Sequence, residues 1–154
     1  MASNAFDFNQ PTEYGFRGLI EFPPHTLGPR AEKIKDMKFS QTAQFRVLSL
    51  SKYIHDKSYL YKPNYTLFKT VFPSWDNTPR KAYSYGVCIL LSDQEYQDWL
   101  RGCIKWTREN NPKDQQYIYI NAWNEWAEGA ILEPTTRYGY KNLELTKQCL
   151  EESK

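Results

Sequence analysis

Three segments of this 154-residue chain follow one order, in which a short apolar stretch precedes a cluster of polar and aromatic residues. They are "GLIEFPPH" (18–25), "TLFKTVFPSWDNTPR" (66–80) and "QQYIYINAWNEWAEG" (115–129). Apolar runs of this length, bounded by proline or polar residues, are typical of β-strands, and the third is continuous enough for a strand buried on both faces of a parallel sheet. The repeated order predicts βα units. In such folds functional groups gather at the carboxyl ends of the strands.

The first segment predicts a strand that extends to Phe22 and ends at residues 23–24, because proline cannot donate to a β-ladder. Glu21 lies inside this apolar strand, and a buried carboxylate needs a partner. Arg80 is the candidate partner. His25 follows the two prolines and is either an ordinary loop residue or a group at a site.

The second segment places Trp75, Asp76, Asn77 and Arg80 after its strand. An aromatic ring, a carboxylate, an amide and a guanidinium suit stacking and hydrogen bonding against a sugar ring. The alternative is a local Asp/Asn turn in which Arg80 pairs with Asp76. The sequence leaves both interpretations open.

The third segment carries two carboxylates between tryptophans. If Asn124 caps a short turn, Glu125 and Glu128 lie on one face with Cβ atoms about 5–6 Å apart. That spacing is close to what two-carboxylate glycoside chemistry uses. Trp123 and Trp126 would lower the local dielectric, so that acid and base differ by their surroundings. The three polar clusters are then expected to share one cleft.

A structural interpretation of the same pair is also open. Glu125 and Glu128 could simply complement the dipole of a helix in its first turn, with the tryptophans in the core. Gly129 limits any such helix to about one turn, which leaves little dipole to complement.

Three helices complete the organisation of the chain. Ser92 and Glu95 form a capping box at the start of the clearest one, which ends at residues 110–112. Its inward face is a set of residues at helical spacing: Tyr96, Trp99, Leu100, Cys103, Ile104 and Thr107. A closing helix is predicted over residues 140–151 with Leu143 and Leu150 inward, and a short helix near residues 49–56.

Composition limits the function classes. The net charge of +2 gives no electrostatic reason for a nucleic-acid or membrane partner, and 16% aromatic residues leave rings available for stacking on a neutral ligand. The three cysteines form no CxxC pair, so neither a disulfide framework nor a metal site is indicated, and no cofactor is expected. The start lacks a signal-peptide pattern, and no apolar run is long enough to span a membrane. We expect one domain, residues 1–154, in the cytoplasm.

The motifs "EFPPH", "FPSWDNTPR" and "NAWNEWAEGAILEP", in this order, resemble the WbsX family of bacterial polysaccharide-biosynthesis proteins, also described as similar to glycoside hydrolase family 99. The resemblance covers nearly the whole chain but only the C-terminal part of the family's sequence. It implies a (β/α)₈ barrel of the TIM type. Three βα units are only about three-eighths of such a barrel, for which about 250 residues is typical, so the expected fold is α/β and incomplete.

The resemblance also implies roles at the third motif. Its core reads Glu125-Trp126-Ala127-Glu128, where family 99 has Glu-Trp-His-Glu. Glu125 would deprotonate a sugar 2-hydroxyl, whose oxygen attacks the anomeric carbon, and Glu128 would protonate the leaving oxygen. Ala127 departs from the family 99 motif, which leaves the direction of the reaction open.

The candidate site therefore consists of two catalytic residues and ten that bind substrate. The catalytic pair is Glu125 and Glu128. The substrate-binding residues are Glu21, His25, Trp75, Asp76, Asn77, Arg80, Trp123, Asn124, Trp126 and Glu133.

The function predicted from sequence is cleavage or transfer of a glycosidic bond in surface-polysaccharide metabolism of the O-antigen or lipopolysaccharide type. A glycosyltransferase that uses an activated donor is an alternative, although the chain has no Gly-rich phosphate loop and no Asp-x-Asp motif. A non-catalytic carbohydrate-binding remnant is another. The sugar and its linkage are not specified. The strand edges of a partial barrel favour self-association or a second chain that completes it.

Overall fold

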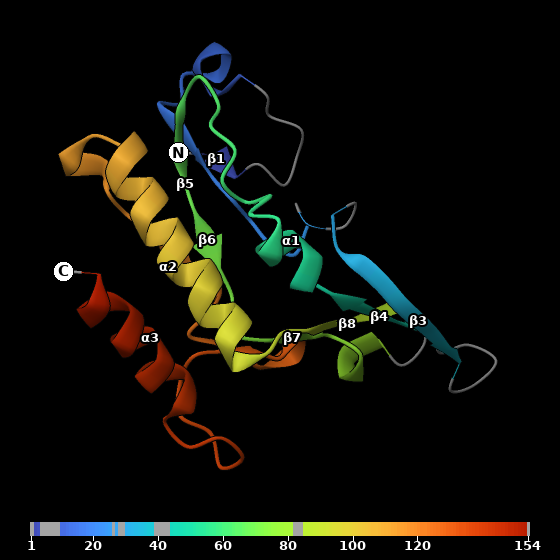
Figure 1. Ribbon diagram of the computed structural model, residues 1–154. Helices are drawn as coiled ribbons and strands as arrows, with labels where there is room; N and C mark the ends of the chain where they lie inside the picture. Colours follow the sequence, from blue (N-terminus) through green and yellow to red (C-terminus); the bar gives the residue numbers. More distant parts are fainter. Residues whose placement is uncertain are drawn as a thin grey trace.

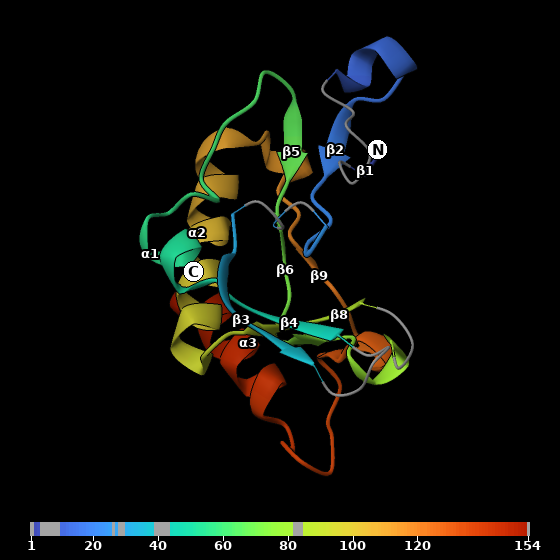
Figure 2. The same ribbon diagram turned by 90° about the vertical axis from the view of Figure 1, so that its right-hand side faces the viewer.

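The computed structural model describes residues 2–3, 10–25, 27, 30–38, 44–81 and 85–153. Its first feature is a set of parallel strands. β1 (Ala2–Ser3) pairs with β2 (Gly18–Ile20), and β2 pairs with β5 (Thr66–Phe68). After Lys69 the chain continues as β6 (Thr70–Val71), which pairs in parallel with β9 (Tyr119–Ile120). The three strands predicted from sequence are therefore neighbours that run in one direction (Figure 2).

A second sheet contains four strands in the order β3–β4–β8–β7. Its members are β3 (Glu32–Lys38), β4 (Gln44–Ser49), β8 (Tyr85–Leu90) and β7 (Trp75–Asp76). β4 and β8 are parallel, whereas β3 and β7 run antiparallel to their neighbours. In Figure 2, β6 and β9 run toward this sheet. It was not predicted from the sequence.

The helices were predicted more accurately. α1 (Ser51–His55) and α2 (Asp93–Asn110) lie where expected, and the capping box of Ser92 and Glu95 is present. All six residues of the predicted inward face of α2 are buried. The ring of Trp99 meets that of Phe72 edge-on at 5.2 Å, which fixes α2 against the segment after β6.

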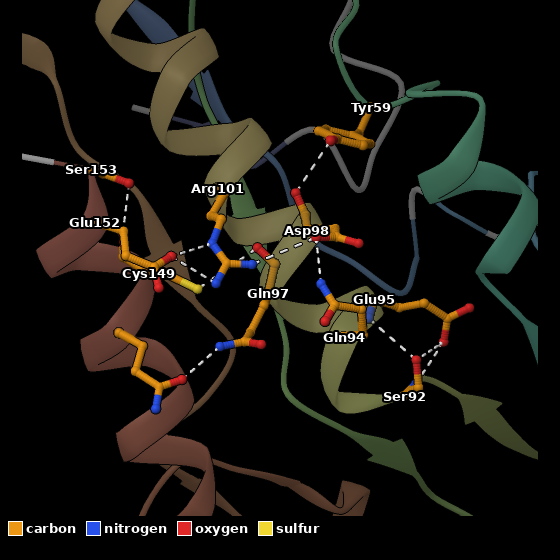
Figure 3. A network of polar contacts seen from close by, with 11 residues as sticks. Tyr59, Ser92, Gln94, Glu95, Gln97, Asp98, Arg101, Cys149, Glu152 and Ser153 are labelled. Atoms are coloured by element: carbon orange, nitrogen blue, oxygen red, sulfur yellow. Dashed lines mark hydrogen bonds and ion pairs between the residues drawn. The ribbon is translucent and has the colours of Figure 1, made fainter.

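α3 (Lys141–Glu152) lies beside α2 (Figure 1). Arg101 bonds Glu152 at 2.8 Å and Gln97 donates to Gln148 at 2.9 Å, so polar contacts fasten the two helices (Figure 3). The predicted inward face of α3 was wrong at Leu150, which is 52% exposed, while Thr146 and Cys149 face the core. Thr146 is one of the residues on the inward face of α3, where it shares a buried hydrogen bond of 2.8 Å with Tyr96 of α2.

Short turns and the hairpin of β10 (Asn124–Glu125) and β11 (Ala130–Ile131) are the remaining described elements. In the described part of the chain, the 3₁₀ turns are η2 (Pro11–Tyr14), η3 (Pro79–Lys81), η4 (Lys113–Gln115) and η5 (Trp126–Glu128). β10 and β11 form an antiparallel hairpin around η5.

The prediction of a mixed α/β fold is confirmed, and the barrel remains a prediction. The described strands form separate sheets and no closed barrel. Two details of the strand predictions were wrong. Phe22 lies beyond β2 and is 39% exposed. β9 is only half-buried, because among the described strands it pairs with β6 alone.

Candidate functional site

The three sequence motifs begin at the same edge of the parallel strands. Val71 is in register with Ile120, and the N–H of Asn121 donates to the carbonyl of Val71 at 2.8 Å. The side-chain amide of Asn121 donates to the carbonyl of Pro23 at 2.8 Å, which ties the third motif to the first. The chain segments that carry the motifs therefore meet at this edge, but the prediction that their polar residues share one cleft is wrong for Glu21, which lies in the core.

The second and third motifs are locked together. The hydroxyl of Ser74 donates to the carbonyl of Gly129 at 2.6 Å. Gly129 has φ +60°, and a Cβ on it would lie 3.0 Å from both the nitrogen and the carbonyl oxygen of Asp76. Arg80 reaches across to Glu128, with 3.2 Å between Nη1 and Oε1. The loop after β6 thus supports the loop after β9.

The second motif contains a turn held by local hydrogen bonds. Asp76 Oδ1 accepts from the N–H and the hydroxyl of Thr78 at 3.0 and 2.6 Å. Asn77 Oδ1 accepts from the N–H of Val87 at 2.7 Å. Because the ion pair of Arg80 is with Glu128, the alternative in which Arg80 pairs with Asp76 is wrong, although the turn itself is present.

The segment of residues 122–133, which we call the acidic loop, is an open hairpin. Glu125 lies at the end of β10, and the N-cap of the single 3₁₀ turn is Glu125 rather than Asn124. The side chain of Glu125 is exposed, and the flanking Trp123 and Trp126 are 52% and 57% exposed. The loop therefore presents one carboxylate and two indole faces to the surroundings. Such rings can stack on a sugar.

The base of the acidic loop is held by backbone hydrogen bonds. The N–H groups of Leu132 and Glu133 both donate to the carbonyl of Trp123, at 3.0 and 2.9 Å. Glu133 and Glu128 are both partly buried, and the side chain of Glu128 is 19% exposed. The hairpin therefore fixes the positions from which Glu125 and Glu128 project.

Glu21 lies in the core, and its predicted partner was wrong. Its Oε1 accepts from Lys69 Nζ at 2.9 Å, and both residues are buried. Lys69 Nζ also donates to the carbonyl of Tyr59 at 2.6 Å and lies 4.1 and 4.4 Å from the ring centroids of Tyr61 and Trp106. Lys69 directly follows β5, which pairs in parallel with β2, so its side chain reaches Glu21. Arg80 lies in the later turn η3.

The environment of this pair holds neighbouring tyrosines neutral. Burial raises the pKa of Tyr61, and the Glu21 carboxylate raises it further through its charge and a side-chain hydrogen bond. Burial and then the Glu21 charge likewise raise the pKa of Tyr65. We call Glu21 and Lys69 the buried ion pair. Glu21 also accepts from the N–H of Thr70 at 3.4 Å, which fits a role of the pair in joining β2 to the strand segment 66–71.

A pocket of about 520 Å³ lies between the segment that follows β2 and the second sheet. Its polar and aromatic wall comprises His25, Arg46, Trp75 and Asn77, and its aliphatic wall includes Leu27, Ala31, Leu48, Val87 and Ile89. His25 is exposed and stacks on Phe22, with ring centroids 5.4 Å apart. Trp75 is 2% exposed.

The structure therefore divides the twelve predicted residues into three groups. Glu21 belongs to the buried ion pair, and His25, Trp75 and Asn77 line the pocket. The remaining eight belong to the acidic loop and the turn beside it: Asp76, Arg80, Trp123, Asn124, Glu125, Trp126, Glu128 and Glu133.

Sequence reasoning missed two polar residues at these places. Lys69 lies within the apolar stretch "TLFKTVF", and a charge in such a stretch is the same signal that identified Glu21. Arg46 lies within "QFRVLSL", and its guanidinium carbon is 4.9 Å from the ring centroid of Tyr85. Within the described ranges, no group of three or more His, Cys, Asp or Glu side chains could hold a metal ion.

Comparisons with known proteins agree with the resemblance read from the motifs. The family model described as "Glycosyltransferase WbsX" matches residues 1–146. The chain is 34% identical over 145 residues to proteins named "Uncharacterized protein WxcX" from two strains of Xanthomonas campestris pv. campestris, ATCC 33913 and B100. The alignment covers 94% of this chain and 21% of each relative, so the chain spans about a fifth of their length. No solved structure matches it. None of the described helices has the length and apolar character needed to cross a lipid bilayer.

Proposed function

Because the chain belongs to the WbsX glycosyltransferase family, we propose that it acts on a carbohydrate in surface-polysaccharide metabolism and that the acidic loop carries the reaction. The reaction is cleavage or transfer of a glycosidic bond. The relatives are about five times as long as the matched segment, so the proposal concerns the part of the site that this chain supplies.

The observation that supports the proposal most strongly is the combination of groups on the acidic loop. An exposed carboxylate, Glu125, stands between two half-exposed indoles, and a second carboxylate, Glu128, is held by Arg80. Carbohydrate sites combine aromatic faces that stack on the sugar with a pair of carboxylates that divide acid and base roles.

The two carboxylates have distinct proposed roles. Glu125 removes the proton of a sugar 2-hydroxyl, and the oxygen attacks the anomeric carbon. The bond from that carbon to the leaving oxygen breaks, and protonated Glu128 donates its proton to that oxygen. After it has donated its proton, Glu128 is a carboxylate. The Arg80 guanidinium, with Nη1 3.2 Å from Oε1 of Glu128, stabilises this negative charge. Water, or an acceptor hydroxyl in the case of transfer, then attacks the anomeric carbon of the anhydro intermediate and gives its proton to Glu128, while Glu125 returns its proton to the 2-oxygen.

Transfer from an activated donor is the second candidate, favoured by the family description "Glycosyltransferase WbsX". In that reaction the acidic loop would bind the acceptor sugar, and one carboxylate would remove a proton from its attacking hydroxyl. Consumption of a sugar nucleotide by the protein would favour this reaction over cleavage.

The experiment is a comparison of three proteins on oligosaccharide fragments of a bacterial surface polysaccharide, with products detected by mass spectrometry. Wild-type protein should form product. Glu125→Gln should lose turnover by roughly 10²–10⁴-fold, the contribution typical of a general base. Glu144→Gln, an exposed glutamate of α3, is the matched control and should retain wild-type turnover.

Two results would contradict the proposal. Equal turnover by Glu125→Gln and wild type would remove the acidic loop from the chemistry. Binding of oligosaccharide without any product, unchanged by Glu125→Gln or Glu128→Gln, would instead identify a carbohydrate-binding segment.

A further inference from the structure

The pocket beside the acidic loop has mostly aliphatic walls. Leu27, Leu48 and Ile89 are buried, and Val87 and Ala31 complete this part of the lining. Its volume of about 520 Å³ falls in the range of small-molecule sites, which are mainly apolar with a few placed polar groups. The chemistry of those few polar groups therefore decides which ligand fits.

Apart from His25, whose ring can donate or accept, the polar groups of the pocket wall are hydrogen-bond donors. Arg46 and the indole of Trp75 can only donate. Asn77 Oδ1 already accepts from the N–H of Val87, which turns the amide so that its NH₂ group remains as the donor. The indole nitrogen of Trp75 is buried and has no acceptor within the described part of the chain. None of the described lining residues is a carboxylate.

This combination disfavours a ring covered with hydroxyl groups. Each hydroxyl carries a donor, and a donor left unpaired among aliphatic side chains costs about 1–3 kcal/mol. An acylamino group fits better, because it brings a single N–H donor in place of several hydroxyl donors, its carbonyl oxygen only accepts hydrogen bonds, and its methyl group packs on aliphatic side chains. A sugar carboxylate also accepts and would meet the Arg46 guanidinium, but the rest of its charge would lie against the aliphatic walls.

We propose that this pocket binds the acyl group of an N-acylated sugar. The inference rests on the proposed function, since that is what makes the ligand a sugar. Trp75 and Asp76 are consecutive in β7, so their side chains point to opposite faces; Trp75 lines the pocket, and Asp76 lies against Gly129 of the acidic loop. The pocket and the loop are thus back to back across one strand.

The acylated sugar is a different residue from the reacting one. The proposed chemistry uses a free 2-hydroxyl on the sugar at the acidic loop, so a 2-acylamino sugar cannot be the sugar that reacts there. The ligand is then a chain that contains both the N-acylated residue and the residue attacked at its anomeric carbon.

The test measures binding of three methyl glycosides by NMR titration: the N-acetylglucosaminide, the glucoside and the glucuronide. The N-acetylated glycoside should bind at least about tenfold more tightly than the glucoside, the factor that one net hydrogen bond provides. Saturation transfer from protein protons should be strongest at its acetyl methyl group. This readout needs only the wild-type protein.

A variant locates the ligand. Asn77→Asp keeps the oxygen that accepts from Val87 and removes the NH₂ donor, so it should weaken N-acetylglucosaminide binding at least about tenfold. Asn64→Asp makes the same chemical change at an exposed position outside the pocket and should leave binding unchanged.

Each other result overturns the inference in a recognisable way. Equal binding of the glucoside, or binding unaffected by Asn77→Asp, removes the acyl preference while the proposed function stands. Tightest binding of the glucuronide assigns the pocket to a carboxylate instead. Oligosaccharide turnover without binding of any of the three also contradicts only the pocket assignment. Absence of both binding and turnover contradicts the proposed function as well.

Discussion

The buried ion pair and the acidic loop both contain glutamates that follow parallel strands, yet their surroundings are opposite. Glu21 is 6% exposed and accepts a hydrogen bond from Lys69, whose ammonium group lies over the rings of Tyr61 and Trp106. Glu125 is exposed between two tryptophans that are themselves more than half exposed. A carboxylate whose hydrogen bonds are all made inside the protein stabilises the fold, whereas one that faces outward beside open rings is available to a ligand.

The largest expected effect comes from breaking the buried ion pair. Lys69→Met leaves the Glu21 carboxylate buried without its cation, and removal of one partner of a buried pair typically costs 3–5 kcal/mol, so we expect a loss of about that size. Urea denaturation measures it. The double variant Lys69→Met/Glu21→Leu removes both charges and should recover most of the loss. A single variant as stable as wild type would show that the pair carries little of the fold.

A smaller effect is expected where the acidic loop meets the second motif. Gly129→Ala places a Cβ at a residue with φ +60°, which costs roughly 1–2 kcal/mol, and also 3.0 Å from the Asp76 backbone. Gly139→Ala is the matched control, because Gly139 has φ +57° but no atom within 4 Å of the added Cβ. Thermal unfolding should show the larger loss for Gly129→Ala. Equal losses would mean that the contact with Asp76 is easily relieved.

Glu95 provides an intermediate case between the two carboxylates. Burial raises its pKa, but hydrogen bonds from Ser51 and Ser92 outweigh burial and lower the pKa below its ordinary value. The resulting stabilisation is present above the unfolded pKa of about 4.3 and is lost as the pH falls through the lower folded pKa. Ser92→Ala should therefore cost about 1 kcal/mol at pH 7 and less in acid. Denaturation at pH 7 and pH 3 measures the difference, and a cost independent of pH would contradict the role of the carboxylate.

The smallest effect concerns the ion pair at the acidic loop. Arg80 is 44% exposed, and exposed pairs contribute about 0.2–1 kcal/mol, so Arg80→Gln should reduce stability by no more than this. The loss should shrink as salt is added. Lys105→Gln, from an exposed pair within α2, is the control. If Arg80→Gln lost as much stability as Lys69→Met, the Arg80–Glu128 pair would stabilise the fold as strongly as the buried ion pair does, contrary to the difference described here.

The parts of the fold that depend on local sequence were predictable. The capping box and the 3–4 spacing of apolar residues located α2 and its buried face, because both signals arise within the helix itself. The three parallel strands were also recognised, since each is an apolar run closed by polar residues. Leu150 was assigned to the core incorrectly, because spacing alone does not show which side of a short helix meets its neighbour.

The parts of the fold that depend on contacts between residues far apart in the sequence were not predictable. The pairing of β4 with β8 joins segments about forty residues apart, and neither segment carries a signal for the other. The partner of Glu21 was assigned to Arg80 because both are charged, while the contact is made by Lys69 across adjacent strands. The candidate site was likewise predicted only in part. Its motifs were found from the sequence, but the structure was needed to assign their residues to the core, the pocket or the acidic loop.

The comparison is tested most directly by one measurement, the rate of product formation from a surface-polysaccharide oligosaccharide per folded molecule. Glu125→Gln should lose turnover while its unfolding curve matches wild type, and Lys69→Met/Glu21→Leu should retain turnover even where its stability differs. Retained turnover in Glu125→Gln together with lost turnover in the folded double variant would place the chemistry at the buried pair and contradict this account.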